Sequence, residues 1–285
     1  MDAGPWHVGE LRAHVLAGGD YAPGGGGIRD FMPDQQRLFF AQLPFLVAAT
    51  VDDAGAPMAT PLTGGEGFVA SPDPETLAIA AVSPDPAGRR LVAGAPVGLL
   101  GLDPQTRRRN RANGRIAFAG ELGLIVTVEQ SFGNCPQYIH RRGLTVDPHV
   151  AGPVETFEGL NDVARAQIAA ADTFFVATSS GAGVEGGGVD VSHRGGPAGF
   201  VRIEGDALVI PDYRGNRYFN TLGNLLLEPR AALLFVDFAT GRLLQLQGTA
   251  EVLWDAHDLP AAERTWRFRP TRGFRRASGL QLTGV

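Results

Sequence analysis

The stretch Phe174-Phe175-Val176-Ala177 repeats, with one change, the earlier stretch Phe45-Leu46-Val47-Ala48. The likeness continues downstream, where Leu233-Leu234-Phe235-Val236-Asp237 matches Leu99-Leu100-Gly101-Leu102-Asp103. A repeat of this length is too long for a solenoid or propeller unit. It therefore predicts two copies of one small domain in a single chain.

The composition is that of a globular protein. Of 285 residues, 44% are hydrophobic and 19% are charged, which suffices for the cores of one large or two modest domains. The formal net charge of -5 argues against general nucleic-acid binding, because such binding needs a positive field. The chain contains no lysine, so a cationic side chain that binds phosphate must be an arginine.

Cysteine usage and hydropathy indicate in which cellular compartment the protein is expected. The single cysteine, Cys135, excludes an internal disulfide framework and a cysteine-rich metal site, and it favours a reducing environment. The N-terminus lacks the pattern of a secretory leader, and no stretch approaches the length that spans a bilayer. We therefore expect a cytoplasmic protein without a membrane partner and without a bound metal.

Both halves consist of short β-branched and aromatic runs separated by turn residues, which predicts mainly β-structure. Helices are expected at residues 87–93, 161–171 and 217–227, the last ended by Pro229. Many short strands with few short flanking helices favour a small antiparallel β-barrel in each half.

Domain boundaries follow from this pattern. We expect an N-terminal extension with a helix over residues 1–44, a first barrel over 45–145 and a linker over 146–160. The second barrel is expected to occupy residues 161–285. Within it, residues 266–276 alternate aromatic and basic side chains, which favours an edge strand at the C-terminal end.

Three segments resemble a known family. Two of them, Asp190-Val191-Ser192-His193-Arg194-Gly195-Gly196 and Gly215-Asn216-Arg217-Tyr218-Phe219-Asn220-Thr221, resemble the FMN-binding split barrels related to pyridoxamine 5'-phosphate oxidase. The third, Gln130-Ser131-Phe132-Gly133-Asn134-Cys135-Pro136-Gln137-Tyr138-Ile139, is similar to a motif of the tandem, double-barrel members. The resemblance implies two tandem split barrels of the FMN-binding type.

The resemblance also implies an FMN site. A phosphate prefers bidentate arginines, hydroxyl groups and the free N–H groups of a helix start, which the first two motifs supply. The implied cofactor-binding residues of the second half are Ser192, His193, Arg194, Asn216, Arg217, Asn220 and Thr221. Those of the first half, which cover the flavin, are Asn134, Gln137 and Tyr138. The corresponding first-half stretches, residues 60–64 and 87–90, lack the same combined set of hydroxyl and amide side chains. This asymmetry favours the second barrel.

The implied function is that of an FMN-dependent oxidoreductase with an unknown small substrate or a separate electron-transfer partner. The flavin carries the redox chemistry, so no catalytic acid or base is assigned. Pyridoxamine 5'-phosphate oxidation itself is not expected, because residues 266–285 lack the Arg-x-His segment of true oxidases. The resemblance implies a flavin between two barrels, and we expect a homodimer.

Two other functions stay open: a non-catalytic flavin-binding protein, and a haem-binding split barrel that uses His193 as a ligand. Two local features also have two interpretations. Cys135 and His140 could form a thiol–imidazole pair, although a buried, unreactive cysteine is more common. The arginines of the run Arg107-Arg108-Arg109-Asn110-Arg111 either reach a ligand of the other barrel or, as we expect, lie on a solvated strand face.

Overall fold

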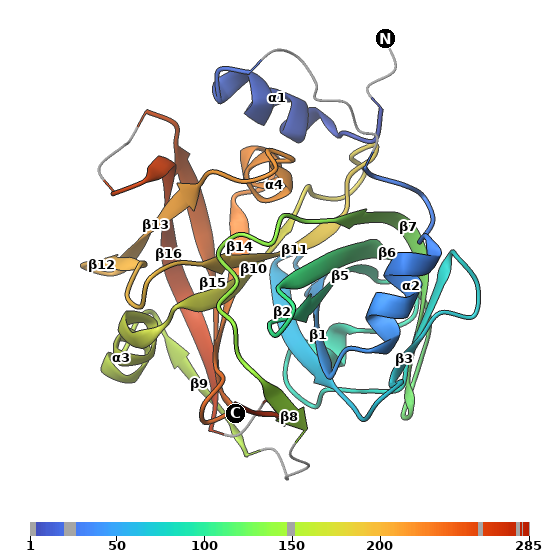
Figure 1. The fold of residues 1–285 in the computed structure, drawn as a ribbon. Helices are drawn as coiled ribbons and strands as arrows, with labels where there is room; N and C mark the ends of the chain where they lie inside the picture. The colour runs from blue at the N-terminus through green and yellow to red at the C-terminus, as the bar shows by residue number, and fades with distance from the viewer. Residues whose placement is uncertain are drawn as a thin grey trace.

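The structure is a computed structural model that describes residues 4–19, 27–146, 152–255, 259–277, 280 and 282–284. Figure 1 shows two β-barrels side by side, with short helices at their edges. The described strands form a seven-stranded sheet, an eight-stranded sheet and a separate two-stranded sheet. The expected mainly-β class with two tandem split barrels is confirmed.

The first barrel is a seven-stranded antiparallel sheet with the order β2-β1-β5-β6-β7-β4-β3. Helix α2 (Asp34–Ala41) precedes its first strand and lies over the barrel in Figure 1. The strands are β1 (Phe45–Val51), β2 (Pro57–Thr63), β3 (Val69–Ala70), β4 (Thr76–Ile79), β5 (Pro96–Asp103), β6 (Arg108–Gly120) and β7 (Gly123–Gly133).

The second barrel has the equivalent order β11-β10-β14-β15-β16-β13-β12, so each strand corresponds to the one nine places earlier. Helices α3 (Asp162–Ala170) and α4 (Asn220–Leu227) flank it. The strands are β10 (Thr173–Ser179), β11 (Val189–Gly195), β12 (Arg202–Glu204), β13 (Ala207–Tyr213), β14 (Arg230–Asp237), β15 (Arg242–Leu253) and β16 (Ala262–Arg276).

The repeat seen in the sequence is shifted by one residue in the first strand. Leu46 lies opposite Gly101, and Phe174 lies opposite Phe235. Gly101 and Phe235 are equivalent within the matching β5 and β14 runs, so Leu46 rather than Phe45 is the counterpart of Phe174. Because successive side chains in a strand point to opposite faces, Phe45 packs between the barrels whereas Phe174 packs inside the second barrel.

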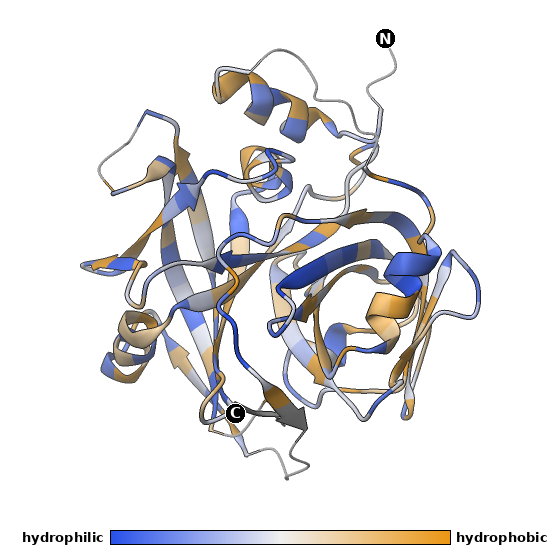
Figure 2. Ribbon diagram, in the orientation of Figure 1, coloured by the Kyte–Doolittle hydropathy of each residue, from blue (hydrophilic) through white to orange (hydrophobic). Residues whose placement is uncertain are grey.

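Three large hydrophobic clusters account for most of the buried core. One fills the first barrel, one fills the second, and the third lies between them. The cluster between the barrels combines Val47 and Leu100 of the first half with Phe175 and Leu234 of the second. Figure 2 shows hydrophobic and hydrophilic residues alternating along many strands, as expected where the two faces of a strand differ. The barrels therefore pack against each other through β1, β2 and β5 of the first and β10, β11 and β14 of the second.

Strand β16 is an interior strand, so the expected edge strand is wrong. It pairs with β15 on one side and with β13 and β9 (Val154–Glu158) on the other. Trp266 and Phe268 are fully buried in the second barrel. Aromatic residues also alternate with basic residues in an interior strand when one face of the strand lines a core. In β16 the aromatic residues Trp266 and Phe268 form the core-facing side. Strand β9 itself falls within residues 146–160, the segment expected to be a linker.

The helices differ from expectation mainly at their starts. Residues 87–93 contain only a 3-10 turn, η1 (Gly88–Arg90), whose first N–H is bound by the Asp85 carboxylate at 2.7 Å. Helix α3 follows Asn161, which accepts a hydrogen bond from the backbone of Ala164 as an N-cap. Helix α4 starts at Asn220, because the residues before it adopt a left-handed conformation. It ends at Leu227, before Pro229, as expected.

An additional helix, α1 (Val8–Leu16), lies directly against α4. A Cβ atom on Gly9 would stand 2.2 Å from the carbonyl oxygen of Gly223, so the two helices touch through their backbones. His7 caps the start of α1 by accepting a hydrogen bond from the Gly9 N–H at 3.1 Å. None of the described helices has the length and apolar character needed to cross a bilayer. The two-stranded sheet, β8 (Leu144–Val146) and β17 (Leu282–Gly284), lies near the C-terminus.

Candidate functional site

The predicted site residues gather around two small adjoining cavities between the barrels. The Arg217 cavity, of about 60 Å³, is lined by Ser192, Arg194, Asn216, Arg217, Asn220 and Thr221 among others. The Tyr138 cavity, of about 70 Å³, is lined by Asn134, Gln137, Tyr138, His193, Arg194 and Asn216 among others. Arg111 of β6 lines both cavities, so the first barrel contributes to each.

Strand β11 and helix α4 supply the polar wall of the Arg217 cavity. Ser192 and Arg194 lie two residues apart on β11 and therefore point to the same side. Thr221 of α4 donates its hydroxyl proton to the Ser192 hydroxyl oxygen at 2.8 Å. Arg111 reaches across from the first barrel and donates to Ser192 at 2.5 Å and to Asn220 Oδ1 at 2.8 Å. One guanidinium thus links β11 and α4.

The turn before α4 is held in an uncommon backbone conformation. Arg217 and Phe219 have φ angles of 59° and 55°, a region that residues other than glycine rarely adopt. The Arg217 side chain is half exposed and lies 3.5 Å from Glu263. On the opposite wall, Arg194 lies 3.6 Å from Asp212, which also accepts a hydrogen bond from Arg264. Arg194 and Arg217 therefore reach the same cavity from different elements.

Arg109 and His193 form the inner contact of the Tyr138 cavity. Arg109 Nη1 lies 2.9 Å from His193 Nδ1. A guanidinium has only donors, so Nδ1 accepts and the proton of the neutral imidazole is on Nε2. Burial, reinforced by the charges of Arg109 and Arg194, holds the pKa of His193 well below its ordinary value. The imidazole is therefore neutral at physiological pH.

Tyr138 closes this cavity from the segment that follows β7. Its ring stacks on Tyr213 with centroids 5.2 Å apart, and its hydroxyl donates to the carbonyl oxygen of Arg214 at 3.0 Å. Tyr138 also has a φ angle of 64°, so the segment is held in a strained conformation. Tyr138 as a whole residue is 40% exposed. The stacked tyrosines thus lie at the border between the cavity and solvent.

Three guanidinium groups give the site a positive charge. Burial, followed by repulsion from Arg111 and Arg194, lowers the pKa of Arg109 to about 9. Burial lowers the pKa of Arg111 to about 10, although Asp190 partly opposes the shift. The Nε atoms of Arg109, Arg111 and Arg194 have no hydrogen-bond partner among the described residues, and neither does Asn134 Oδ1. Unpaired buried donors beside excess positive charge fit an anionic ligand rich in acceptors.

The Arg107–Arg111 run was expected to lie on a solvated strand face. This expectation is wrong for Arg109 and Arg111, which are mostly buried. Figure 2 shows the hydrophilic start of β6, and the second barrel covers this part of the strand. The signal in the sequence was the spacing, because Arg109, Arg111 and Asn113 share one face of β6. Asn113 donates to Asp190 at 2.7 Å. Sequence reasoning did not single out Asp190 or Glu10, which lies behind Asn220.

The other end of the interface holds the equivalent residues of the first barrel. Thr60 on β2 takes the place of Ser192, and Leu62 takes the place of Arg194. Gln245 on β15 takes the place of Arg111. Here Asp85 accepts hydrogen bonds from Thr60 at 2.7 Å and from Gln245 at 2.8 Å. At this end the Asp85 carboxylate therefore binds the polar side chains, and the counterparts of Arg194 and Arg111 are not arginines.

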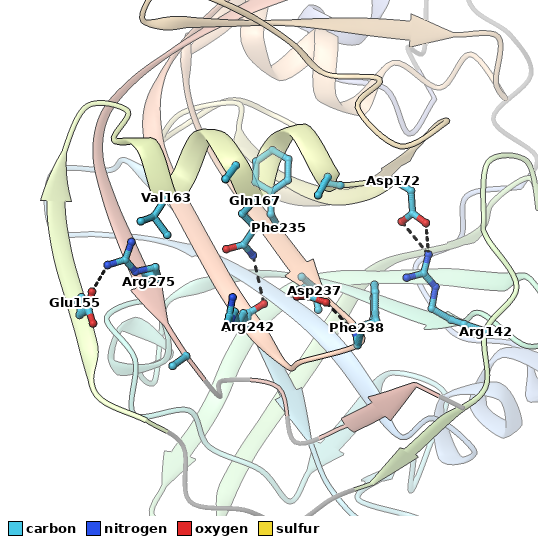
Figure 3. A pocket seen from close by; sticks show the side chains of 16 residues that line it. Arg142, Glu155, Val163, Gln167, Asp172, Phe235, Asp237, Phe238, Arg242 and Arg275 are labelled. Carbon is cyan, nitrogen blue, oxygen red and sulfur yellow. Dashed lines mark hydrogen bonds and ion pairs between the residues drawn. The ribbon is translucent and has the colours of Figure 1, made fainter.

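A larger cavity, of about 680 Å³, lies elsewhere, between α3 and the ends of β14 and β16. None of the predicted site residues lines it. Figure 3 shows Arg142 directed at Asp172 and Arg275 directed at Glu155, so these two arginines already have carboxylate partners. Size alone would favour this cavity, but the hydroxyl, amide and guanidinium groups of the three sequence motifs line the smaller cavities. The chemistry described above is at the smaller cavities.

Cys135 lines the Tyr138 cavity, but no pair with His140 is formed among the described residues. His140 Nε2 donates instead to the carbonyl oxygen of Gly196 at 2.7 Å. The thiol is partly exposed and free. Because this ring nitrogen is bonded to a backbone carbonyl group, His140 is not placed to act as a base for the Cys135 thiol.

A family model matches the second barrel, and solved structures resemble parts of the chain. Residues 160–271 match the family model described as pyridoxamine 5'-phosphate oxidase. No curated protein matches the chain. Among solved structures, HupZ of Group A Streptococcus is 16% identical over 42% of this chain and 97% of its own, with a TM-score of 0.33. An FAD-binding protein from Mesorhizobium loti is 14% identical over 44% of this chain and 99% of its own, with a TM-score of 0.30. The family match thus covers the second barrel, from the start of α3 into β16, and the first barrel lies outside it.

Proposed function

We propose that this chain binds FMN at the Arg217 and Tyr138 cavities and acts as a flavin-dependent oxidoreductase. The observation that carries the proposal is the cluster of buried guanidinium groups with unpartnered N–H donors. A phosphate with a negative charge and several acceptor oxygens satisfies both features. The match of residues 160–271 to the pyridoxamine 5'-phosphate oxidase family supports the same ligand class.

The phosphate group is assigned to the Arg217 cavity. Its volume of about 60 Å³ suits a compact group, and its walls carry hydroxyls, an amide and guanidinium donors. Ser192, Thr221 and Asn220 lie in one hydrogen-bonded network with Arg111. Replacing these internal hydrogen bonds by bonds to a phosphate keeps every donor satisfied. Arg194 and Arg217 add charge from two sides.

The flavin ring is assigned to the Tyr138 cavity, which must widen to admit it. A cavity of about 70 Å³ is far below the roughly 300–1,000 Å³ of ordinary ligand pockets. The stacked Tyr138 and Tyr213 rings lie at the solvent border, so separation of this pair is the opening that we infer. The unpartnered Arg109 Nε donor and Asn134 Oδ1 acceptor would then face the polar edge of the ring.

When bound, the flavin supplies the hydride or electron transfer itself. The residues of this chain bind, orient and exclude water. Neutral His193 is fixed by Arg109, and the positive charge of Arg109 and Arg194 favours an electron-rich flavin ring. The carbonyl group of Arg214 and the Tyr138 hydroxyl hold the covering segment in place. No residue of the described site needs to act as a catalytic acid or base for this role.

The first experiment is the absorption spectrum of the purified protein, before and after addition of FMN. We expect the visible bands of oxidised flavin to appear with the protein fraction after gel filtration. A spectrum of bound haem and no retained flavin would instead support the haem-binding alternative. Turnover with reduced nicotinamide donors and dye acceptors then separates an oxidoreductase from a non-catalytic flavin-binding protein.

A further inference from the structure

A buried carboxyl group lies directly behind the Arg217 cavity. Glu10 of α1 is 3% exposed, and its Oε1 atom accepts a hydrogen bond from Asn220 Nδ2 at 2.5 Å. Its Oε2 atom accepts from the backbone N–H of His7 at 3.1 Å. Asn220 in turn accepts from Arg111 through Oδ1. Glu10 is therefore one residue removed from the cavity and is connected to it through Asn220.

The position of Glu10 is fixed by the packing of α1. The backbone contact between Gly9 and Gly223 leaves no room for a side chain between the helices. Two aromatic contacts flank it: Trp6 meets Tyr218 with ring centroids 5.1 Å apart, and His14 meets Phe219 at 4.8 Å. The carboxyl group thus has little freedom to turn toward solvent when its charge changes.

The charged groups around Glu10 come from three elements. Arg111 of β6 is the nearby cation, and Asp190 of β11 is the nearby anion. His7 and His14 belong to α1 itself, and burial lowers the pKa of each, so both are neutral near pH 7. Burial, followed by the charge of Asp190, raises the pKa of Glu10 to about 8. The carboxyl group therefore holds a proton at neutral pH and loses it in mildly alkaline solution.

We propose that Glu10 is a positioning residue that makes anion binding at the Arg217 cavity depend on pH, acting through Asn220 and Arg111. With the proton in place, Arg111 keeps its charge available to the ligand phosphate. After the proton is lost, a buried negative charge attracts Arg111 and the Asn220 amide and lowers the positive potential of the cavity. By linkage, a bound anion also makes Glu10 hold its proton more tightly. This inference rests on the proposed function.

The test compares the wild-type chain with Glu10→Gln, which keeps the shape and neutral charge of a protonated carboxyl group, although its amide nitrogen cannot accept one of the two hydrogen bonds made to Glu10. FMN affinity is measured by quenching of flavin fluorescence between about pH 6.5 and about pH 9. We expect the wild-type affinity to fall about fivefold to tenfold across this range, since a shift of one pKa unit on binding is a tenfold effect. The affinity of Glu10→Gln should change by less than about twofold.

A matched control is Glu155→Gln, which removes an exposed carboxylate that lines neither the Arg217 nor the Tyr138 cavity and should follow the wild-type profile. The pKa values of Arg109 and Arg111 are also lowered, so these two groups can lose charge toward pH 9 in both proteins. The test of Glu10 is therefore the difference between the pH profiles of wild type and Glu10→Gln. Parallel loss of affinity in both proteins would overturn the inference.

Sulfate serves as a second probe, because its charge is constant over this range, and its binding is measured by calorimetry. If FMN does not bind at pH 6.5 but sulfate does, the proposed function fails while the sulfate profile still tests Glu10. Sulfate binding that weakens with pH in wild type but not in Glu10→Gln supports the inference. If neither FMN nor sulfate binds at pH 6.5, the inference about Glu10 is overturned.

Discussion

Thr60 of β2 stands at the position in the first barrel that Ser192 of β11 holds in the second. Thr60 pairs with Ala48, Ser192 pairs with Val176, and these partners are equivalent in the two sheets. The two hydroxyl groups nevertheless meet opposite charges: Ser192 contacts the Arg111 guanidinium, whereas Thr60 contacts the Asp85 carboxylate. The two ends of the interface thus have the same framework and different chemistry.

From this difference we predict one FMN per chain. The Asp85 carboxylate and the absence of the two equivalent arginines disfavour a phosphate at the first-barrel end. Titration of the protein with FMN, followed by fluorescence quenching, should reach saturation at one equivalent. Asp85→Asn removes the negative charge at the first-barrel end. It should leave the stoichiometry unchanged, because Leu62 and Gln245 still stand where the second-barrel end has Arg194 and Arg111. Two equivalents in the wild-type chain would contradict this assignment.

Arg194→Ala should weaken FMN binding about tenfold to a hundredfold, as expected for loss of a charge-assisted contact of about 1.5–3 kcal/mol. Arg111→Gln should have an effect of at least this size, because the buried Arg111 guanidinium also donates hydrogen bonds to Ser192 and Asn220. Arg217→Ala should also weaken binding, but less, since its side chain is half exposed and lies near Glu263. Arg89→Ala, at the first-barrel end, is the control and should bind FMN normally. The reverse order of effects would place the phosphate in the first barrel.

FMN should bind more tightly than riboflavin, because most of the site's donors face the Arg217 cavity. The difference should shrink in Arg217→Ala, while riboflavin affinity changes little, because Arg217 lines the Arg217 cavity and not the Tyr138 cavity. Both affinities are measured by fluorescence quenching at the same ionic strength, since phosphate contacts are sensitive to salt. Equal affinities in the wild-type protein would show that the phosphate is not recognised.

Gly9→Ala should destabilise the fold, because the added methyl group would lie 2.2 Å from the Gly223 carbonyl oxygen. A loss of about 1–3 kcal/mol is expected for such overpacking, measured by chemical denaturation. Gly65→Ala is the control, since a Cβ atom there meets nothing within 4 Å. If Gly9→Ala were as stable as this control, the close contact between α1 and α4 would not exist in solution.

The stability of the chain without ligand should depend on Glu10. The folded-state pKa of about 8 exceeds the unfolded value near 4.5, so the folded state holds the extra proton between these pH values. The contribution of Glu10 to the free energy of unfolding therefore declines as pH rises from about 4.5 to about 8 and is constant above. Relative to wild type, Glu10→Gln should gain on the order of 2–4 kcal/mol across this window, measured by denaturant unfolding. Identical pH profiles would mean that Glu10 titrates normally.

The sequence predicted the architecture well because strand and turn signals are local. The Phe174 run, the break at Pro229 and the cap at Asn161 each act through neighbouring residues, and each is found where expected. The one-residue shift at Phe45 was not visible, because Phe45 and Leu46 are both apolar and only the partner strand decides which faces inward.

The site was predicted only in part, for a related reason. Ser192, Asn220 and Thr221 stand in the motifs themselves, and the fold brings them together with Asn134 and Tyr138. The burial of Arg109 and Arg111 depends on how the second barrel covers β6, which no local pattern encodes. Glu10 is more distant still, because its contact with Asn220 joins residues 210 positions apart. The expected domain boundaries, homodimer and cytoplasmic location stay predictions.

Joining the two barrels in one chain also changes how substitutions act on the interface. In an assembly of two identical chains, every substitution occurs at both ends at once, so a residue that favours stability at one end must also be tolerated at the other. Here Asp85, Thr60 and Gln245 occupy one end without constraining Arg111, Ser192 and Asn220 at the opposite end. Selection can therefore treat one end as a structural joint and the other as a binding surface, with no compromise between them.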